Sequence, residues 1–280
     1  MHVTSVTKLP LADPPLNFQH VSSACKADVT CANCNLRELC LPRGLCDADM
    51  QRVENVVYVR RRIKRGETLF NAGEQFNSIY AVRVGFFKTS VIDNDGREQV
   101  MGFFMGGELL GMDGVGSGCY NGTATALEDS EVCVMPFSLI EDMASRIRAL
   151  QRNLHSVLAR EIVRDHGVMM LLGSMCAEER LAAFLLNLSQ RFTARGYSPS
   201  EFVLRMTREE IGSYLGLKLE TVSRVFSKFQ NAGLVAVQQK HIRITDIPGL
   251  RQIVGQTRQT RRAGRTAVSI GSPETHALSV

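Results

Sequence analysis

The chain has 280 residues, a hydrophobic content of 44%, a charged content of 22% and a formal net charge of +5. This length allows two domains with separate cores, and the small net charge excludes a uniformly basic nucleic-acid-binding surface. No stretch is apolar for long enough to span a membrane or to act as a signal peptide, so we expect a cytoplasmic protein without a membrane partner. In that compartment the eight cysteines are expected to be ligands or buried thiols rather than disulfides.

The N-terminal region combines a predicted flexible arm, residues 1–24, with a cysteine-rich loop, residues 25–46. Within this loop, the spacing of Cys31, Cys34 and Cys40 lets three thiolates converge on one soft metal centre. Zinc usually takes a second CxxC or CxxH pair, which this segment lacks, whereas an iron–sulfur cluster accepts one ligand from a distant segment. The alternative is that these three cysteines are unpaired thiols. Their spacing favours a metal centre but does not identify the metal.

Residues 47–137 have the pattern of a β domain. Short runs of alternating apolar residues are separated by glycines, and they predict strands that include 78–82, 86–92 and 131–135. The sequence 93–96, Asp-Asn-Asp-Gly, predicts a hairpin turn. Many short strands with glycine turns indicate a jelly roll or barrel. Cys133 lies on one of these strands, where a lone cysteine is most often a small buried core residue.

Residues 138–173 change to a helical period and predict one long helix with an apolar seam suited to pairing with a second copy. Asp165 falls inside this seam, where it would weaken self-association through desolvation and like-charge repulsion. The alternative is an intramolecular core helix with Asp165 at its solvated edge. The predicted interface residues are Ile147, Leu150, Leu154, Leu158, Ile162 and Asp165.

Residues 174–249 predict a winged helix-turn-helix. Thr207 and Glu210 form a capping box, Gly216 makes the turn, and a second helix runs from 220 to 231 before two short strands. The start of such a second helix enters the major groove of double-stranded DNA. The residues expected to read bases are Glu220, Ser223 and Arg224, and those expected near phosphates are Lys218 and Arg208. The remaining residues, 250–280, predict a basic and disordered tail.

Four stretches stand out together: Cys31-x2-Cys34-x5-Cys40, Gly107-Glu108-Leu109-Leu110-Gly111, Ala177-Glu178-Glu179-Arg180-Leu181-Ala182 and Leu219-Glu220-Thr221-Val222-Ser223-Arg224. In these stretches the chain resembles the Crp/Fnr superfamily of bacterial transcription regulators and, within it, the Fnr oxygen sensors. The resemblance implies an α+β protein with an N-terminal β jelly roll like cyclic-nucleotide-binding domains, a long dimerisation helix and a C-terminal winged helix-turn-helix. It also implies a [4Fe-4S] cluster held by Cys31, Cys34, Cys40 and Cys133.

The same resemblance implies an oxygen-responsive regulator of anaerobic gene expression that is not an enzyme. The cluster-bound chain would form a homodimer on palindromic promoter sites of the TTGAT…ATCAA kind, and Leu39 would limit oxygen access. Asp93, Asp95 and Gly96 match the surface loop that touches RNA polymerase. Cys25, Cys46, Cys119 and Cys176 match no family ligand.

Three other kinds of protein could combine a metal-binding loop or a β domain with these features. A regulator activated by a cyclic nucleotide needs an arginine late in the β domain, and the chain has none between Arg97 and Arg146, so no cyclic nucleotide is expected. An enzyme built on the metal centre would be expected to carry a catalytic motif such as HExxH or GxSxG, and none occurs. A Crp-like regulator with a structural zinc loop, or with a different signal, stays open because sequence cannot identify the metal.

Overall fold

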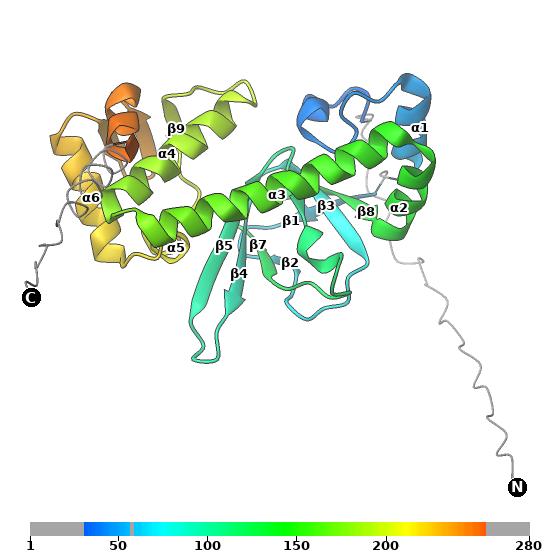
Figure 1. Cartoon of the computed structure of the whole chain (residues 1–280), viewed down its shortest axis with the longest axis horizontal. Helices are drawn as coiled ribbons and strands as arrows, with labels where there is room; N and C mark the ends of the chain where they lie inside the picture. The colour runs from blue at the N-terminus through cyan, green and yellow to red at the C-terminus, as the bar shows by residue number, and fades with distance from the viewer. Residues whose placement is uncertain (1–30, 57–58, 256–280) are drawn as a thin grey trace, which may run out of the picture.

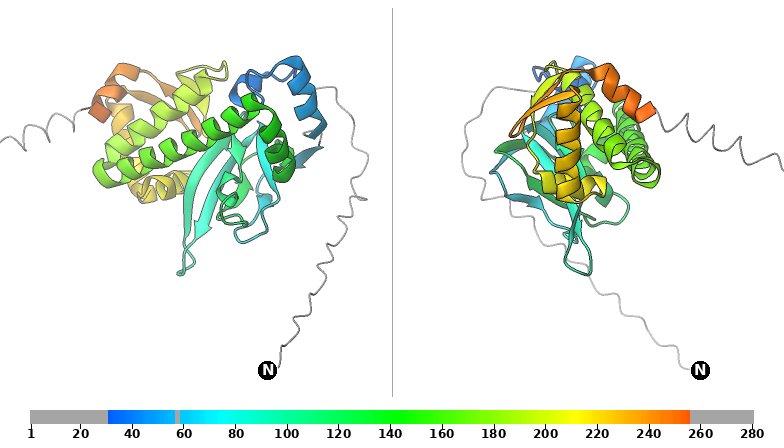
Figure 2. Two further views of the ribbon diagram at one scale, coloured as in Figure 1. Left: turned by 45° about the vertical axis from the view of Figure 1, so that its right-hand side comes forward. Right: turned by 90° about the vertical axis from the view of Figure 1, so that its left-hand side faces the viewer.

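A computed structural model describes residues 31–56 and 59–255. The long helix α3 (Arg148–Ser174) runs along the molecule, with the cysteine loop near one end and the C-terminal domain at the other (Figure 1). The loop contains a short 3-10 helix, η1 (Arg37–Leu39), and leads into helix α1 (Asp47–Val56). The left-hand view of Figure 2 shows the same separation of the two ends.

The β domain consists of two antiparallel four-stranded sheets. The strand orders are β1-β8-β3-β6 and β2-β7-β4-β5, so the predicted β architecture is confirmed. The strands are β1 (Val59–Ile63), β2 (Thr68–Phe70), β3 (Ser78–Val84), β4 (Phe86–Ile92), β5 (Glu98–Met105), β6 (Leu109–Leu110), β7 (Thr123–Ala126) and β8 (Ser130–Pro136). A 3-10 helix, η2 (Met112–Gly114), follows β6.

Side chains that alternate along the strands fill the space between the two sheets. Phe70 and Tyr120 stack with ring centroids 4.0 Å apart, and Phe87 and Val132 are fully buried in the same cluster. Because neighbouring residues on a strand face opposite ways, Val132 points into this cluster and Cys133 does not. Cys133 instead packs on the outer side, toward the cysteine loop.

The helical stretch predicted over 138–173 is divided into two helices, α2 (Phe137–Arg146) and α3, rather than one. Ile147 between them has an extended backbone, with φ −112° and ψ 96°. The break lets α2 fold back on the start of α3, so Ile140 and Ala144 of α2 share one core with Leu150 and Leu154. Apolar residues recur with a helical period in both segments, so this pattern does not predict the bend between them.

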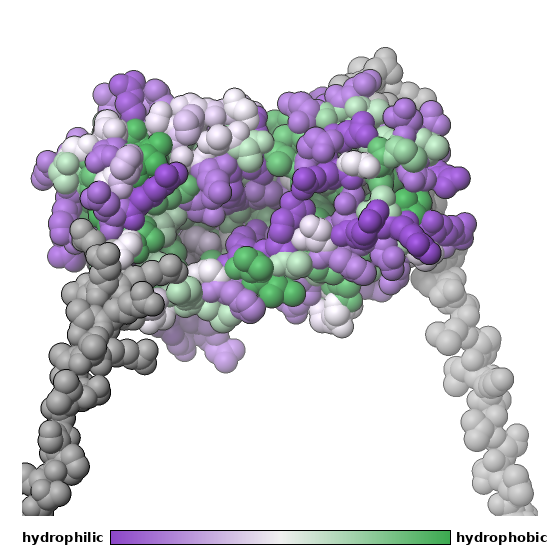
Figure 3. All heavy atoms as spheres, turned by 45° about the horizontal axis from the view of Figure 1, so that its top comes forward, coloured by the Kyte–Doolittle hydropathy of each residue, from purple (hydrophilic) through white to green (hydrophobic). Residues whose placement is uncertain are grey.

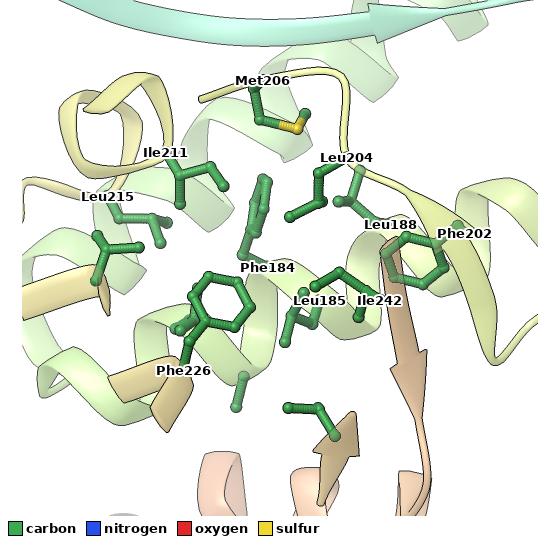
Figure 4. Packing of buried hydrophobic residues seen from close by; sticks show 14 of the residues in the cluster. Phe184, Leu185, Leu188, Phe202, Leu204, Met206, Ile211, Leu215, Phe226 and Ile242 are labelled. Atoms are coloured by element: carbon green, nitrogen blue, oxygen red, sulfur yellow. The ribbon is translucent and has the colours of Figure 1, made fainter. Parts of the chain in front are cut away.

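The C-terminal domain is a winged helix-turn-helix, as predicted. It contains α4 (Ala177–Thr193), β9 (Glu201–Val203), α5 (Arg208–Leu215), α6 (Leu219–Asn231), β10 (Val235–Gln238) and β11 (His241–Ile244), with the sheet order β10-β11-β9. Phe184, Phe226 and Ile242 meet in its centre (Figure 4). Residues 247–255 are helical and Leu250 is fully buried, so this domain extends beyond the predicted boundary at 249.

The β domain and the winged domain share a continuous contact. Phe103 of β5 lies 6.0 Å from Phe184 of α4 and 5.2 Å from Tyr214 of α5, measured between ring centroids. With the top of Figure 1 tilted forward, the visible surface is mostly hydrophilic with separate apolar patches (Figure 3). Within the described residues, no helix is long and apolar enough to cross a membrane.

Candidate functional site

The cysteine loop is curled by a series of backbone hydrogen bonds. The N–H of Cys34 donates to the carbonyl of Cys31 at 3.3 Å, that of Arg37 to Cys34 at 3.0 Å, and that of Cys40 to Leu36 at 3.1 Å. These consecutive turns replace an extended path, so residues nine apart in sequence come close together. The loop can therefore present three thiols to one place.

All four predicted ligands line one small cavity. Cys31, Cys34 and Cys40 from the loop meet Cys133 of β8 around a space of about 30 Å³, which Met135 also lines. Strand pairing places Cys133 opposite Ala81 of β3, and Ala81 lines the same cavity. The structure thus brings together residues that are about a hundred positions apart in the chain, as the resemblance implied.

Burial raises the pKa of three of these thiols, Cys31, Cys40 and Cys133. It raises the pKa of Cys31 to about 11 and that of Cys40 to about 12, and repulsion among the neighbouring thiolates adds to both shifts. The pKa of Cys133 is also raised by burial, against the opposing effect of Arg60 and Arg83. A metal reverses this balance, because its positive charge stabilises the thiolates that ligate it.

The residues present fit a thiolate-ligated metal group by their chemistry. Four cysteines in a cavity lined mainly by apolar atoms are the donor set of an iron–sulfur cluster or of a structural zinc. Within 31–56 and 59–255, no three Cys, His, Asp or Glu side chains are already arranged to hold one metal ion. The four thiols are therefore gathered at one site without being preset around a single ion.

Two glycines of the β domain admit the loop. Gly107 has φ +86°, and a Cβ on it would lie 2.8 Å from Cβ of Leu39. A Cβ on Gly106 would lie 3.0 Å from Cδ1 of Leu36. Side chains at these positions would push the loop outward, so the Gly106–Gly107 surface fixes how closely Leu36 and Leu39 can approach.

Helix α3 holds the other side of the loop. The side-chain amide of Asn153 donates to the carbonyl of Leu41 at 3.0 Å and to that of Arg43 at 2.6 Å. Leu41 is fully buried in the core that α1, α2 and α3 share. The loop is thus attached to the helix that was predicted to form the dimer.

The predicted dimer interface divides into two parts. Ile147, Leu150 and Leu154 are buried in the chain's own core, because α1 and α2 cover α3 there, and they are not available to a partner in this arrangement. Leu158 is half-buried, whereas Ile162 is 56% exposed and Asp165 is exposed. The second half of α3 also exposes Val163, Met169, Met170 and Leu172.

The helix-turn-helix is defined by its caps and by one glycine. Thr207 accepts from the N–H of Glu210 at 3.1 Å and Glu210 accepts from the N–H of Thr207 at 2.7 Å, so the predicted capping box starts α5. Gly216 ends α5 with φ 62°. The N-cap of α6 is Lys218, whose side chain makes no capping hydrogen bond.

The predicted base-reading residues lie on one exposed face of α6. Glu220, Ser223 and Arg224 are exposed, and the opposite face buries Val222, Val225, Phe226 and Phe229. This division leaves the polar face free for a ligand while the apolar face holds the helix in the domain. Lys218 is also exposed, beside the start of the same helix.

Arg208 occupies a more enclosed position than a phosphate contact would suggest. Its guanidinium carbon lies 3.4 Å from the centroid of the Phe226 ring, and its Nη1 is buried without a hydrogen-bond partner in the described part of the chain. Desolvation lowers the pKa of Arg208 to about 10. In this structure the side chain supports the packing of α6 against α5, and its predicted contact with DNA phosphate stays a prediction.

The predicted polymerase loop is the tip of the β4–β5 hairpin, which projects from the body of the molecule (Figure 2). The Asp93 carboxylate accepts from the N–H groups of Asp95 and Arg97, both at 2.9 Å, and these hydrogen bonds lower its pKa. Gly96 takes φ 78°, as the predicted turn requires. The tip is therefore ordered by its own residues.

One polar contact joins the β domain to the winged domain, and the sequence alone assigns it no role. Glu108 follows Gly107 and accepts from Arg191 Nε at 3.0 Å and from Arg195 Nη2 at 2.6 Å, both on α4. The Arg195 side chain is 6% exposed. Arg191 and Arg195 are four apart on a helix, and this spacing is the sequence signal that could have suggested a shared partner.

The other cysteines stand apart from the site. Cys46, Cys119 and Cys176 are exposed, whereas each of the four predicted ligands that line the cavity is half-buried. Cys25, the predicted arm 1–24 and the tail from 256 lie outside the described residues.

Comparisons with known proteins agree with this architecture. Family models match a cyclic nucleotide-binding domain at residues 60–146 and a Crp-like helix-turn-helix domain at residues 179–253. The transcriptional regulatory protein btr of Bordetella pertussis is 45% identical over 226 residues, which cover 81% of this chain and 93% of that protein. The fumarate and nitrate reduction regulatory protein of Escherichia coli is 41% identical over 230 residues, covering 82% and 92% of the two chains.

A solved structure extends the likeness to three dimensions. FixK2 from Bradyrhizobium japonicum has a TM-score of 0.64 and 28% identity, over 70% of this chain and 96% of that one. A domain like cyclic nucleotide-binding domains, joined by a long helix to a winged helix-turn-helix, is the architecture of a DNA-binding regulator. The chain belongs to the Crp/Fnr family of transcription regulators.

Proposed function

We propose that this regulator senses oxygen through a [4Fe-4S] cluster held by Cys31, Cys34, Cys40 and Cys133, and that it controls anaerobic or microaerobic gene expression. The observation that carries the proposal is the meeting of these four cysteines at one cavity, with one contributed by β8 and three by the loop. The similarity to a protein named for fumarate and nitrate reduction supports the same reading.

The chain's own residues provide the cage. A bound cluster would supply a group that oxygen can attack, with its positive irons stabilising the four thiolates. Leu36 and Leu39, packed against Gly106 and Gly107, would restrict the approach of solvent and oxygen from one side. Asn153 would hold the loop on α3, so a loop that opens would also lose this helix contact.

The same loop is placed to influence dimerisation. Two copies would pair through the exposed half of α3, where Ile162, Met169 and Leu172 offer apolar surface and Asp165 opposes the contact. The first half of α3 is occupied by the loop, α1 and α2. In the proposed mechanism, the ordered loop fixes this half of α3, so the two exposed halves can pair despite the repulsion between the Asp165 carboxylates.

A dimer would place two copies of α6 on a palindromic promoter. Glu220, Ser223 and Arg224 would read each half of a TTGAT…ATCAA site, with Glu accepting from cytosine and Arg donating to guanine. Lys218 would contact phosphate beside them. The β4–β5 tip with Asp93, Asp95 and Gly96 would then be presented to RNA polymerase.

The test is anaerobic purification followed by iron, sulfide and zinc assays and an absorption spectrum before and after exposure to air. We expect about four irons and four sulfides per chain, lost in air together with binding to the promoter site. The Cys133→Ser variant should lose the iron. The Cys119→Ser variant should keep it, because Cys119 is exposed and lies outside the cavity. Zinc at one per chain, indifferent to air, would instead establish a structural zinc loop and refute the oxygen-sensing proposal.

A further inference from the structure

A second cavity, of about 280 Å³, lies between the cysteine loop and α3. Arg43 and Gly44 line it from the loop, and Arg152, Asn153, Ser156 and Arg160 line it from α3. The helix residues recur at intervals of three and four positions, so they share one face along two turns of α3. None of the predicted DNA, dimer or polymerase contacts lies in this cavity.

The charge in this cavity is uncompensated. Among the described residues, Arg152 and Arg160 have no carboxylate within 4.0 Å and no hydrogen bond, and both are exposed. Arg43 has one acidic neighbour, Glu38, at 4.0 Å, and both of these side chains are more than half exposed. Such a pair is weak, so three guanidinium groups surround the space with almost no opposing charge.

A guanidinium is suited to one class of ligand in particular. Its planar N–H groups donate in pairs to the oxygens of phosphate or carboxylate, and Ser156 adds a hydroxyl to the same lining. The volume is close to the lower end of the range of about 300–1,000 Å³ for small-molecule sites, so the ligand is small. We propose that this cavity binds a multiply charged oxyanion, namely inorganic phosphate or the phosphate group of a small phosphorylated metabolite.

The position of the cavity gives the bound anion a structural effect. Arg43 comes from the loop, whereas Arg152 and Arg160 come from α3, so an anion between them links two elements whose positive charges otherwise repel. Cys40 lines both this cavity and the cavity of the four thiols. An occupied site therefore holds the loop on the helix and restricts access to Cys40.

Binding is measured by titrating inorganic phosphate into the full-length protein at constant ionic strength, with chloride as the balancing anion. Arg152→Gln and Arg160→Gln should each weaken phosphate binding roughly tenfold, because each removes charge-assisted hydrogen bonds. Arg148→Gln is the matched control, since Arg148 is an exposed arginine of the same helix outside the cavity. It should leave binding almost unchanged.

Two outcomes would overturn the proposal. One is a phosphate titration that does not differ from chloride, and the other is an equal loss of binding in Arg148→Gln, which would show only a general effect of net charge. Parallel titrations with glycerol 3-phosphate and citrate define the ligand: tighter binding of the organic phosphate indicates a metabolite, and preference for citrate over phosphate contradicts the assignment of a phosphate group.

A second measurement follows the loop directly in the metal-free protein. Trypsin cleavage after Arg37 and Arg43 releases Cys40 as the only cysteine of peptide 38–43, so its alkylation can be followed by mass spectrometry. At a phosphate concentration ten times the dissociation constant, alkylation of Cys40 should slow roughly tenfold if it requires an open loop. Cys176, the only cysteine of peptide 165–180, should react at an unchanged rate. Equal slowing at both cysteines, or at neither, would refute the effect on the loop.

Discussion

The helix-turn-helix and the cysteine loop are held in place in different ways. Helix α6 alone buries Val222, Val225, Phe226 and Phe229 in a core made mainly by its own domain, to which Phe103 and three other residues of the β domain also contribute. The 3-10 helix η1 in the loop buries no residue, and the loop depends on Gly107, Asn153 and β8 for its position. The comparison teaches that the DNA-binding end owes most of its packing to its own core, whereas the cysteine loop depends on contacts with elements outside it.

The first prediction tests the independence of the DNA-binding end. Phe226→Ala should lower the free energy of unfolding by about 3–5 kcal/mol, because it empties a buried aromatic site and removes the ring beneath Arg208. Ser227→Ala, one residue further on the exposed face, should cost less than about 1 kcal/mol. Chemical denaturation with and without the metal group measures both. If the Phe226→Ala variant is less stable than wild type only when no metal is bound, the cysteine loop and the helix-turn-helix are not independent.

The second prediction concerns the contact between the domains. Glu108→Gln should cost about 3 kcal/mol, because Arg191 and Arg195 lose the carboxylate that compensates them in a mostly buried site. Glu128→Gln breaks the more exposed interdomain pair with Arg205 and should cost no more than about 1 kcal/mol. Thermal unfolding of the two variants measures the difference, and equal losses would contradict the importance assigned to Glu108.

The pH dependence of the same contact has a defined direction. Burial alone would raise the pKa of Glu108, but the neighbouring Arg191 and Arg195 hold this pKa below its ordinary value. A carboxyl group with a lowered pKa stabilises the folded state above its unfolded pKa, and that contribution is lost as pH falls through the folded pKa. The stability difference between wild type and Glu108→Gln should therefore shrink on acidification.

The third prediction tests how the loop depends on its glycine support. Gly107→Ala should destabilise the protein by about 2 kcal/mol, since it adds a methyl group against Leu39 to the cost of a positive φ. Gly66→Ala provides the control, because Gly66 has φ +79° and no atom within 4 Å of its would-be Cβ. Only Gly107→Ala should also accelerate alkylation of Cys40. Equal alkylation rates in the two variants would show that Gly107 does not position the loop.

The smallest expected effect concerns the exposed half of α3. Asp165→Ala should strengthen dimerisation roughly tenfold in the metal-free protein, because it removes the repulsion between two carboxylates at the pairing surface. Asp142→Ala, an exposed acid on α2, serves as a control that should not change dimerisation. Analytical ultracentrifugation measures both. A variant that remains as monomeric as wild type would place the interface elsewhere.

Much of the architecture could be predicted because its signals are local. The capping box of Thr207, the turn at Gly216 and the alternating strands of the β domain each follow from a few neighbouring residues. The spacing of the loop cysteines likewise indicated a metal centre. Spacing alone does not add Cys133 to this group, because its neighbours depend on the pairing of β8 with β3; only the family resemblance points to it.

Other features could not be predicted, because one pattern serves two arrangements. Apolar residues three and four positions apart form the same pattern whether they face α1 and α2 or a second copy of the chain. The pattern therefore predicts a dimer contact for Leu150 and Leu154, which the structure instead buries in the chain's own core. The charges on Arg152 and Arg160 look like an ordinary solvated face until the loop is placed beside them. Both cases require knowledge of what lies across from the helix.

The contact at Glu108 has a consequence for exchanging modules between relatives. The acid belongs to the β domain and both bases belong to α4, so a hybrid made by joining two parents within α3 would combine these halves from different proteins. If the parent that supplies the β domain lacked an acidic residue at this position, the guanidinium groups of Arg191 and Arg195 would lie at the junction without a carboxylate to balance their charge. Functional hybrids of this regulator should therefore inherit residues 103–108 and α4 from one parent, even when the cysteine loop comes from another.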